Sequence, residues 1–135
     1  MGADPSEREC RPSILVVDDD PNVRKFFSQA LNKAGYSVYD VSNGLEAKSL
    51  IQSIQFNLII LDLSMPEMDG FEVLKFARSE QPELKIIVAT GFMQGTMMNA
   101  AKYLGAVATL DKPIQITTLL STVHNVISGQ KPTEE

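Results

Sequence analysis

Short aliphatic runs alternate along the chain with segments in which apolar residues recur every three or four positions. Runs of this kind, rich in β-branched residues and bounded by polar ones, predict strands. The runs are Ile14–Val17, Ser37–Val41, Leu58–Leu61, Lys85–Ala89 and Val107–Leu110. Three of them are almost purely aliphatic, which is typical of strands buried on both faces of a parallel sheet. The second run has more polar residues, so we expect it to lie nearer an edge of the sheet.

The segments between these runs have the spacing of amphipathic helices. Residues separated by three, four, seven and eight positions fall on one face of a helix, and that face can pack on a sheet. An apolar stripe of this kind is present from Val23 to Leu31, Ala47 to Ile54, Met97 to Leu104 and Ile116 to Ile127. A helix after Gly70 is expected to be shorter, and its stripe is less regular.

Polar residues mark the expected starts of several helices. Asp20, ahead of Pro21, offers an N-cap acceptor and a preset first turn. Asn43, with Glu46 three residues later, resembles a capping box. Gln115 stands at the N-cap position of the last helix, and no acid follows in the first turn. That helix therefore lacks the usual support for its N-terminus.

The alternation of strands with helices indicates an α/β domain. Because parallel strands are joined by right-handed crossovers, the helices cover both faces, which predicts a doubly wound, five-stranded parallel sheet. A flavodoxin-like strand order is one of two common solutions, and the pattern alone does not choose between them. We expect the folded domain to cover residues 12–128, with flexible polar tails at residues 1–11 and 129–135.

The composition argues against several classes of protein. With 44% apolar and 21% charged residues over 135 positions, the chain matches an ordinary folded domain. Its net charge of -5 argues against nucleic-acid binding, which needs a surplus of Lys and Arg. No apolar run is long enough to span a membrane, and the single cysteine, Cys10, fits the reducing cytoplasm. We interpret the single histidine, His124, as a surface side chain.

The candidate chemistry lies where the aliphatic runs end. In an open α/β sheet, ligands bind at the rim formed by the carboxyl ends of the parallel strands. The polar residues at these ends are Asp18 and Asp19 after the first strand, Asp62 after the third, Thr90 and Gly91 after the fourth, and Lys112 after the fifth. We therefore expect these residues to lie close together.

Three carboxylates on one rim would repel each other unless a cation offset their charge. Oxygen ligands without histidine or cysteine favour Mg2+ over zinc. Lys112 and the hydroxyl of Thr90 can each contact a phosphoryl oxygen, while Gly91 keeps a backbone amide accessible. A carboxylate nucleophile in such surroundings can accept a phosphoryl group as an acyl phosphate, and Asp62 is the candidate.

Four segments of the chain resemble one known family, the receiver domain of two-component response regulators. The segments are Ile14–Pro21, Leu58–Gly70, Val88–Gly91 and Leu110–Pro113, and they occur in the order and spacing of that family. The resemblance implies a sheet of strand order 2-1-3-4-5 and a signalling switch rather than an enzyme. Asp62 would take a phosphoryl group from a histidine of a sensor kinase or of a histidine phosphotransfer protein.

The resemblance also implies roles for other residues of the rim. The implied Mg2+ ligands are Asp18, Asp19, Asp62 and the backbone carbonyl of Ser64. Lys112 would contact the phosphoryl group and precede a cis peptide bond at Pro113. Thr90 would supply the hydroxyl that moves toward the phosphoryl group on activation.

One position departs from the family pattern. Thr109, three residues before Lys112, stands where an aromatic side chain often swings inward with the moving hydroxyl. Because a small residue cannot fill the same volume, we expect activation to reshape the Gly91 to Gly95 loop and the start of the next helix. An unknown downstream protein would then bind the face around residues 91–110.

The sequence leaves other functions open. An aspartate-nucleophile phosphatase would need a second Asp two residues after Asp62, where Ser64 stands. A phosphorylation-independent adaptor of the same fold would not need the whole set of rim residues. A stand-alone switch is the expected form, because no further recognisable segment follows Ile127. A receiver within a longer regulator would carry the same residues.

Overall fold

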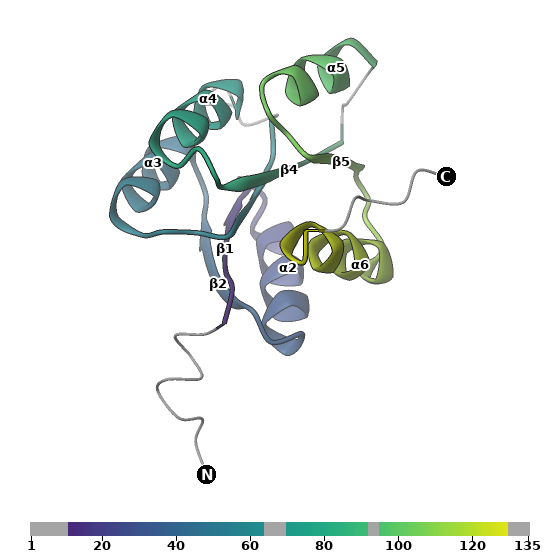
Figure 1. Cartoon of the computed structure of the whole chain (residues 1–135). Helices are drawn as coiled ribbons and strands as arrows, with labels where there is room; N and C mark the ends of the chain where they lie inside the picture. The colour runs from purple at the N-terminus through teal and green to yellow at the C-terminus, as the bar shows by residue number, and fades with distance from the viewer. Residues whose placement is uncertain (1–10, 64–69, 92–94, 130–135) are drawn as a thin grey trace.

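Strands and helices alternate along the part of the chain that the computed structural model describes, residues 11–63, 70–91 and 95–129 (Figure 1). The strands are β1 Ser13–Val17, β2 Ser37–Val41, β3 Leu58–Leu61, β4 Lys85–Thr90 and β5 Ala108–Asp111. The helices are α2 Pro21–Lys33, α3 Gly44–Ser53, α4 Gly70–Glu80, α5 Gly95–Tyr103 and α6 Ile116–Ile127. Each predicted strand and helix is therefore present, and β2 and β3 have the predicted bounds. The expectation of a shorter helix after Gly70 was wrong, because α4 has 11 residues whereas α3 has 10 and α5 has 9.

The last strand begins and ends one residue later than predicted. The side chain of Val107 is 42% exposed, so its aliphatic character was misleading as a sign of a buried strand position. Its backbone N–H still donates to the carbonyl of Ile86 at 2.8 Å. The register of β5 begins with Ala108 opposite Ile87. Val107 thus leads into the strand without belonging to it.

The five strands form one parallel sheet in the order β2-β1-β3-β4-β5. This is the order that the family resemblance implied, and it confirms the doubly wound α/β fold. β2 lies at one edge, as its weaker hydrophobicity predicted. All four residues of β3 are buried, which agrees with a strand in the middle of the sheet.

Two hydrophobic cores lie on the two faces of the sheet. Because successive side chains of a strand point to opposite faces, Ile14 and Val16 of β1 belong to one core and Leu15 and Val17 to the other. The first core contains side chains of α2 and α6, and the second contains side chains of α3, α4 and α5. Figure 1 shows α2 and α6 on one side of the sheet and α3 and α4 on the other. Both faces are covered, so the central strands are inaccessible to solvent.

The predicted helix caps are confirmed, with one difference in detail. Oδ1 of Asp20 accepts from the N–H of Asn22 at 2.9 Å at the start of α2. Asn43 caps α3 by accepting from the N–H of Glu46 at 2.9 Å. Oε1 of Glu46 accepts in return from the N–H of Ser42 at 3.4 Å, one residue before the position in a standard capping box. Gln115 is the N-cap residue of α6, as predicted, but its side chain makes no capping bond.

The outermost elements of the fold agree with the expected domain of residues 12–128. β1 begins at Ser13 and α6 ends at Ile127, so the elements of the described residues lie within 12–128. Residues 1–10 and 130–135 lie outside the described residues, and the flexible tails stay a prediction. Within the described chain, each helix is too short or too polar to cross a membrane.

Candidate functional site

Neighbouring strands bring the candidate residues to one rim of the sheet. Val17 of β1 lies opposite Leu61 of β3, so the residues that follow them, Asp18 and Asp62, leave adjacent strands at the same level. The N–H of Asp62 continues the ladder by donating to the carbonyl of Val17 at 3.0 Å. On the other side of β1, the N–H of Asp18 donates to the carbonyl of Val41 at 3.2 Å. The backbone of both acids is thus held by the sheet itself.

Asp18, Asp19 and Asp62 form the cluster that the sequence predicted. One carboxylate oxygen of each lies within 4.8 Å of the others, a grouping that is unique among the described residues. Asp18 is 1% exposed and Asp62 is 5% exposed, whereas Asp19 faces solvent. The donor set consists of hard carboxylate oxygens with one open side, which fits Mg2+ because this ion prefers oxygen ligands and keeps several waters.

Lys112 reaches both buried acids. Its Nζ donates to Oδ2 of Asp18 at 2.5 Å and to Oδ2 of Asp62 at 3.2 Å. The ammonium group is half-buried and forms ion pairs with both carboxylates. The peptide bond between Lys112 and Pro113 is cis, as the family resemblance implied. One positive charge is therefore shared between two carboxylates that would otherwise repel each other.

The pKa values of Asp18 and Lys112 are both raised, but for different reasons. Burial raises the pKa of Asp18 above its ordinary value, and this outweighs the bonds from Lys112 and from the N–H of Asp20, which lower it. For Lys112, burial lowers the pKa, but the bond to Asp18 and the charge of Asp62 outweigh burial and raise it. Lys112 therefore stays protonated at neutral pH. Asp18 is a buried carboxylate that a further cation would stabilise.

The remaining predicted residues are described only in part. Thr90 ends β4 opposite Asp111, but its side chain lies outside the described residues, as does all of Ser64. A Cβ added to Gly91 would lie 3.9 Å from Cβ of Lys112, so this glycine is next to the lysine stem. Thr109 is half-buried in β5, opposite Val88. The roles assigned to these residues stay predictions.

His124 is exposed in the last turn of α6. The interpretation of this residue as a surface side chain is confirmed.

Gly70 is a part of the site whose importance the sequence did not reveal. A Cβ added here would lie 2.5 Å from Cα of Leu63 and 2.7 Å from the carbonyl oxygen of Asp62. Both atoms belong to the backbone and cannot rotate away. The start of α4 therefore packs against the chain directly after Asp62, at a distance that only glycine allows.

Arg24 of α2 also contacts the acidic loop, residues Asp18–Asp20. Its Nη1 donates to the carbonyl oxygen of Asp18 at 2.8 Å. No motif signals this contact, because it depends on how the first turn of α2 lies beside the end of β1.

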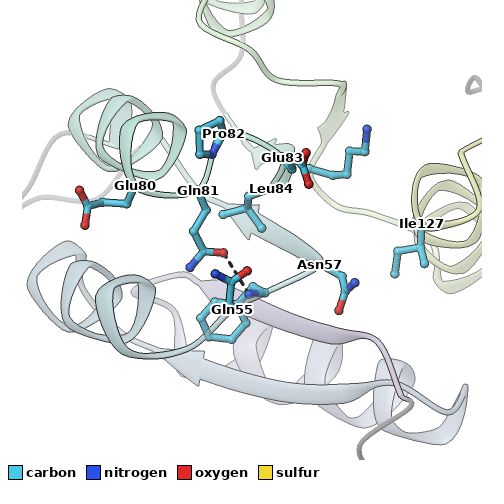
Figure 2. Close-up of a pocket in the computed structure, with 10 residues that line it drawn as sticks. Gln55, Asn57, Glu80, Gln81, Pro82, Glu83, Leu84 and Ile127 are labelled. Atoms are coloured by element: carbon cyan, nitrogen blue, oxygen red, sulfur yellow. Dashed lines mark hydrogen bonds between the residues drawn. The ribbon is translucent and has the colours of Figure 1, made fainter.

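A pocket of about 530 Å³ lies at the opposite end of the sheet, where β3 and β4 begin. Gln81 is the buried polar residue of its lining, and Figure 2 shows its side chain directed from the end of α4 toward the segment before β3. Its Oε1 accepts from the N–H of Phe56 at 3.1 Å, and its Nε2 donates to the carbonyls of Ile51 and Ile54, both at 2.7 Å. None of the three acids lines this pocket, so we interpret it as structural.

Both the sequence and the fold of the chain resemble those of known proteins. The family described as the response regulator receiver domain matches residues 14–124. The sporulation initiation phosphotransferase F of Bacillus subtilis (strain 168) is 32% identical over 114 residues, which cover 84% of this chain and 92% of that protein. The crystal structure of a CheY-like response regulator receiver domain protein from Methanospirillum hungatei JF-1 has 30% identity and a TM-score of 0.86, over 89% of this chain and 96% of that chain. A response regulator from Burkholderia pseudomallei, crystallised with a phosphorylated aspartic acid, calcium ion and citrate, has 26% identity and a TM-score of 0.80, over 87% of this chain and 69% of that chain.

Proposed function

The chain belongs to the response regulator receiver domain family, and from this membership we propose that it is a phosphorylation-dependent switch in which Asp62 is the phosphoacceptor. Receiver domains accept phosphate from histidine kinases or phosphotransfer proteins and use Mg2+ at an acidic pocket. They are signalling phosphoacceptors rather than classical enzymes. The proposal therefore concerns which residues of this chain carry out the family's reaction.

The observation that carries the proposal is the convergence of Lys112 on the carboxylates of Asp18 and Asp62 at the carboxyl rim of the sheet. An oxygen of the Asp62 carboxylate would attack the phosphorus of a phosphohistidine on the donor. The P–O bond forms as the P–N bond breaks, and the electron pair of the P–N bond stays on the imidazole nitrogen. Nζ of Lys112 lies 3.2 Å from Asp62 Oδ2, close enough to contact an oxygen of the phosphoryl group that Asp62 would carry.

The metal assignment rests on the cluster of carboxylates. Asp18, Asp19 and Asp62 would hold Mg2+, together with the backbone carbonyl of Ser64, which lies outside the described residues. When bound, the ion supplies positive charge to the acids and to the phosphoryl oxygens. The raised pKa of Asp18 supports this assignment, because a buried carboxylate without enough positive charge gains most from a cation.

The output of the switch would begin at the end of β4, beside Asp62. Thr90 would move toward the phosphoryl group, and Gly91 would leave a backbone amide accessible to it. Thr109 is half-buried and too small for an aromatic switch, so the change would pass through the segment from Gly91 to Gly95, of which residues 92–94 lie outside the described residues. The face around residues 91–110, which includes the 90% exposed side chain of Tyr103, would bind the downstream protein.

Two further elements complete the proposal. The phosphoryl donor would be a sensor histidine kinase or a histidine phosphotransfer protein. The site of action would be the cytoplasm, because a chain with a single cysteine can form no disulfide within itself and suits a reducing compartment. The chain would act through protein contacts, either alone or as the receiver part of a longer regulator. Both arrangements require the same chemistry at Asp62.

Intact-mass spectrometry after incubation with acetyl phosphate and Mg2+ tests the proposal. The wild-type protein should gain the mass of one phosphoryl group, while Asp62→Asn and a sample with excess EDTA should gain none. Asp111→Asn is the matched control, because this exposed acid also stands at the carboxyl rim. A wild-type protein without added mass, or an Asp62→Asn variant that still gains it, would falsify the assignment. Phosphorylation without any change in partner binding would favour the adaptor alternative.

A further inference from the structure

Arg24 connects the acidic loop to two other elements of the fold. The residue lies in the first turn of α2, where its own N–H donates to the carbonyl of Asp20 at 3.0 Å. Its Nη1 donates to the carbonyl of Asp18 at 2.8 Å, and its Nε lies 3.5 Å from Oδ1 of Asp40 on β2. Asp40 is held in turn by the hydroxyl of Ser28, which donates to its Oδ2 at 3.0 Å. The guanidinium thus joins α2, the edge strand and the end of β1.

Asp18 is fixed at each of its polar groups. Its N–H belongs to the sheet ladder, Oδ2 accepts from Lys112, and Oδ1 accepts from the N–H of Asp20 at 2.9 Å. Its carbonyl accepts from Arg24. The bonds of its N–H and of its two carboxylate oxygens involve backbone groups or Lys112, which belongs to the candidate site. Arg24, in contrast, lies outside that site.

The carbonyl of Asp18 and the N–H of Asp19 belong to one rigid peptide plane. A bond that fixes this carbonyl therefore also fixes the direction in which the chain enters Asp19. The carboxylate of Asp19 is exposed and has little packing to orient it. Control of the peptide plane is thus a means of aiming both acids at one point.

We propose that Arg24, held by Asp40, is a positioning residue that orients the carboxylates of Asp18 and Asp19 for a divalent cation. The inference rests on the proposed function of the acidic rim and extends it to a residue outside the pocket. Groups that orient metal ligands from behind commonly change metal affinity 10- to 100-fold when they are removed.

The positive charge of Arg24 would lower the affinity for Mg2+, whereas its positioning contact would raise it. A positive side chain beside an acidic pocket repels a second cation, so removal of the charge alone would tighten Mg2+ binding. Removal of the positioning contact would weaken it. The direction in which Mg2+ affinity changes in Arg24→Ala therefore distinguishes the charge effect from the positioning effect. Arg24→Lys is a second test of the same distinction. Lysine keeps the charge but lacks the planar fork that contacts Asp18 and Asp40 together.

The first experiment uses the metal-free full chain in EDTA. Amide hydrogen exchange and 1H–15N chemical shifts should show that the N–H of Asp20, which donates to Asp18, exchanges faster in Arg24→Ala and Arg24→Lys than in the wild type. Arg78→Ala is the matched control, since Arg78 donates to the carbonyl of Pro82 at 3.0 Å at the far end of the sheet. Unchanged exchange at Asp20 in both Arg24 variants would overturn the inference. This readout does not depend on metal binding or on phosphorylation.

The second experiment titrates the same variants with Mg2+ and follows the 1H–15N shifts. Arg24→Ala and Arg24→Lys should both bind Mg2+ about tenfold more weakly than the wild type. Asp40→Asn should weaken binding by a smaller factor, and because Asp40 is exposed this variant should fold even if Arg24→Ala does not. Arg78→Ala should bind as the wild type does.

The outcomes of the titration are distinct. Tighter binding by Arg24→Ala, or wild-type binding by Arg24→Lys, would show that the residue acts through charge alone and would refute the positioning role. A wild-type protein that does not bind Mg2+ would instead contradict the proposed function. In that case the exchange measurement in EDTA still decides whether Arg24 orders the acidic loop.

Discussion

Gly70→Ala should damage both the stability and the chemistry of the domain, although it adds a single methyl group. The added Cβ would lie 2.5 Å from Cα of Leu63 and 2.7 Å from the carbonyl oxygen of Asp62. Ordinary carbon contacts are about 3.5 to 4.0 Å, so α4 and the segment after β3 would have to separate by roughly 1 Å. Overpacking of this kind costs about 3 kcal/mol, and the better helix propensity of alanine returns roughly 0.8 kcal/mol. The net loss of about 2 kcal/mol corresponds to a Tm lower by roughly 8 °C.

The same displacement would reach Asp62 directly, because the clash involves its own carbonyl. A shift of about 1 Å in a reacting group can reduce a rate roughly 100-fold, so acetyl phosphate should label Gly70→Ala far more slowly than the wild type. Calorimetry and intact-mass time courses measure the two effects. Gly91→Ala is the control for stability, since its added Cβ would make only an ordinary contact of 3.9 Å with Lys112. A Gly70→Ala variant that melts at or above the wild-type Tm would refute the reasoning.

Two other variants test the buried polar groups. Gln81→Ala should lower the free energy of unfolding in urea by roughly 3 kcal/mol, because three hydrogen bonds to the backbone of Ile51, Ile54 and Phe56 are lost at about 1 kcal/mol each. Gln81→Glu should also destabilise, since a carboxylate cannot donate to the two carbonyls, and a loss well below 1 kcal/mol in both variants would contradict this account. The raised pKa of Lys112 means that its contacts stabilise the fold fully below the unfolded pKa of 10.5 and that this contribution is lost as pH rises through the folded value. The difference in unfolding free energy between wild type and Lys112→Gln should therefore shrink above about pH 10.5, and a difference that stays constant to about pH 12 would be inconsistent with it.

Much of the fold was predictable because burial on both faces leaves a simple pattern. The runs that became β1, β3 and β4 are mostly aliphatic since each of their apolar residues faces one core or the other, and hydrophobicity identifies such strands well. The strand order was not predictable from this pattern, because all central strands are equally apolar. It came from the family resemblance. Val107 shows the reverse error, since an aliphatic residue at a strand end was predicted inside the strand although its side chain is exposed.

The candidate site was predictable as a set of residues but not as a set of contacts. Parallel strands end at one rim, so the position of Asp18, Asp62 and Lys112 in the sequence was enough to predict that they meet. The need for glycine at position 70 and the bond from Arg24 to the Asp18 carbonyl arise from the way helices pack beside strand ends. Such contacts join residues of ordinary type at unremarkable spacings, and only the folded arrangement reveals them.

The two polar centres of the domain, the acidic rim and Gln81, lie at opposite ends of β3. A strand of four residues is about 13 Å long, which is beyond the range at which substitutions usually influence each other. Substitutions near Gln81 should therefore change the stability of the sheet at its amino end, while the chemistry at Asp62 stays the same.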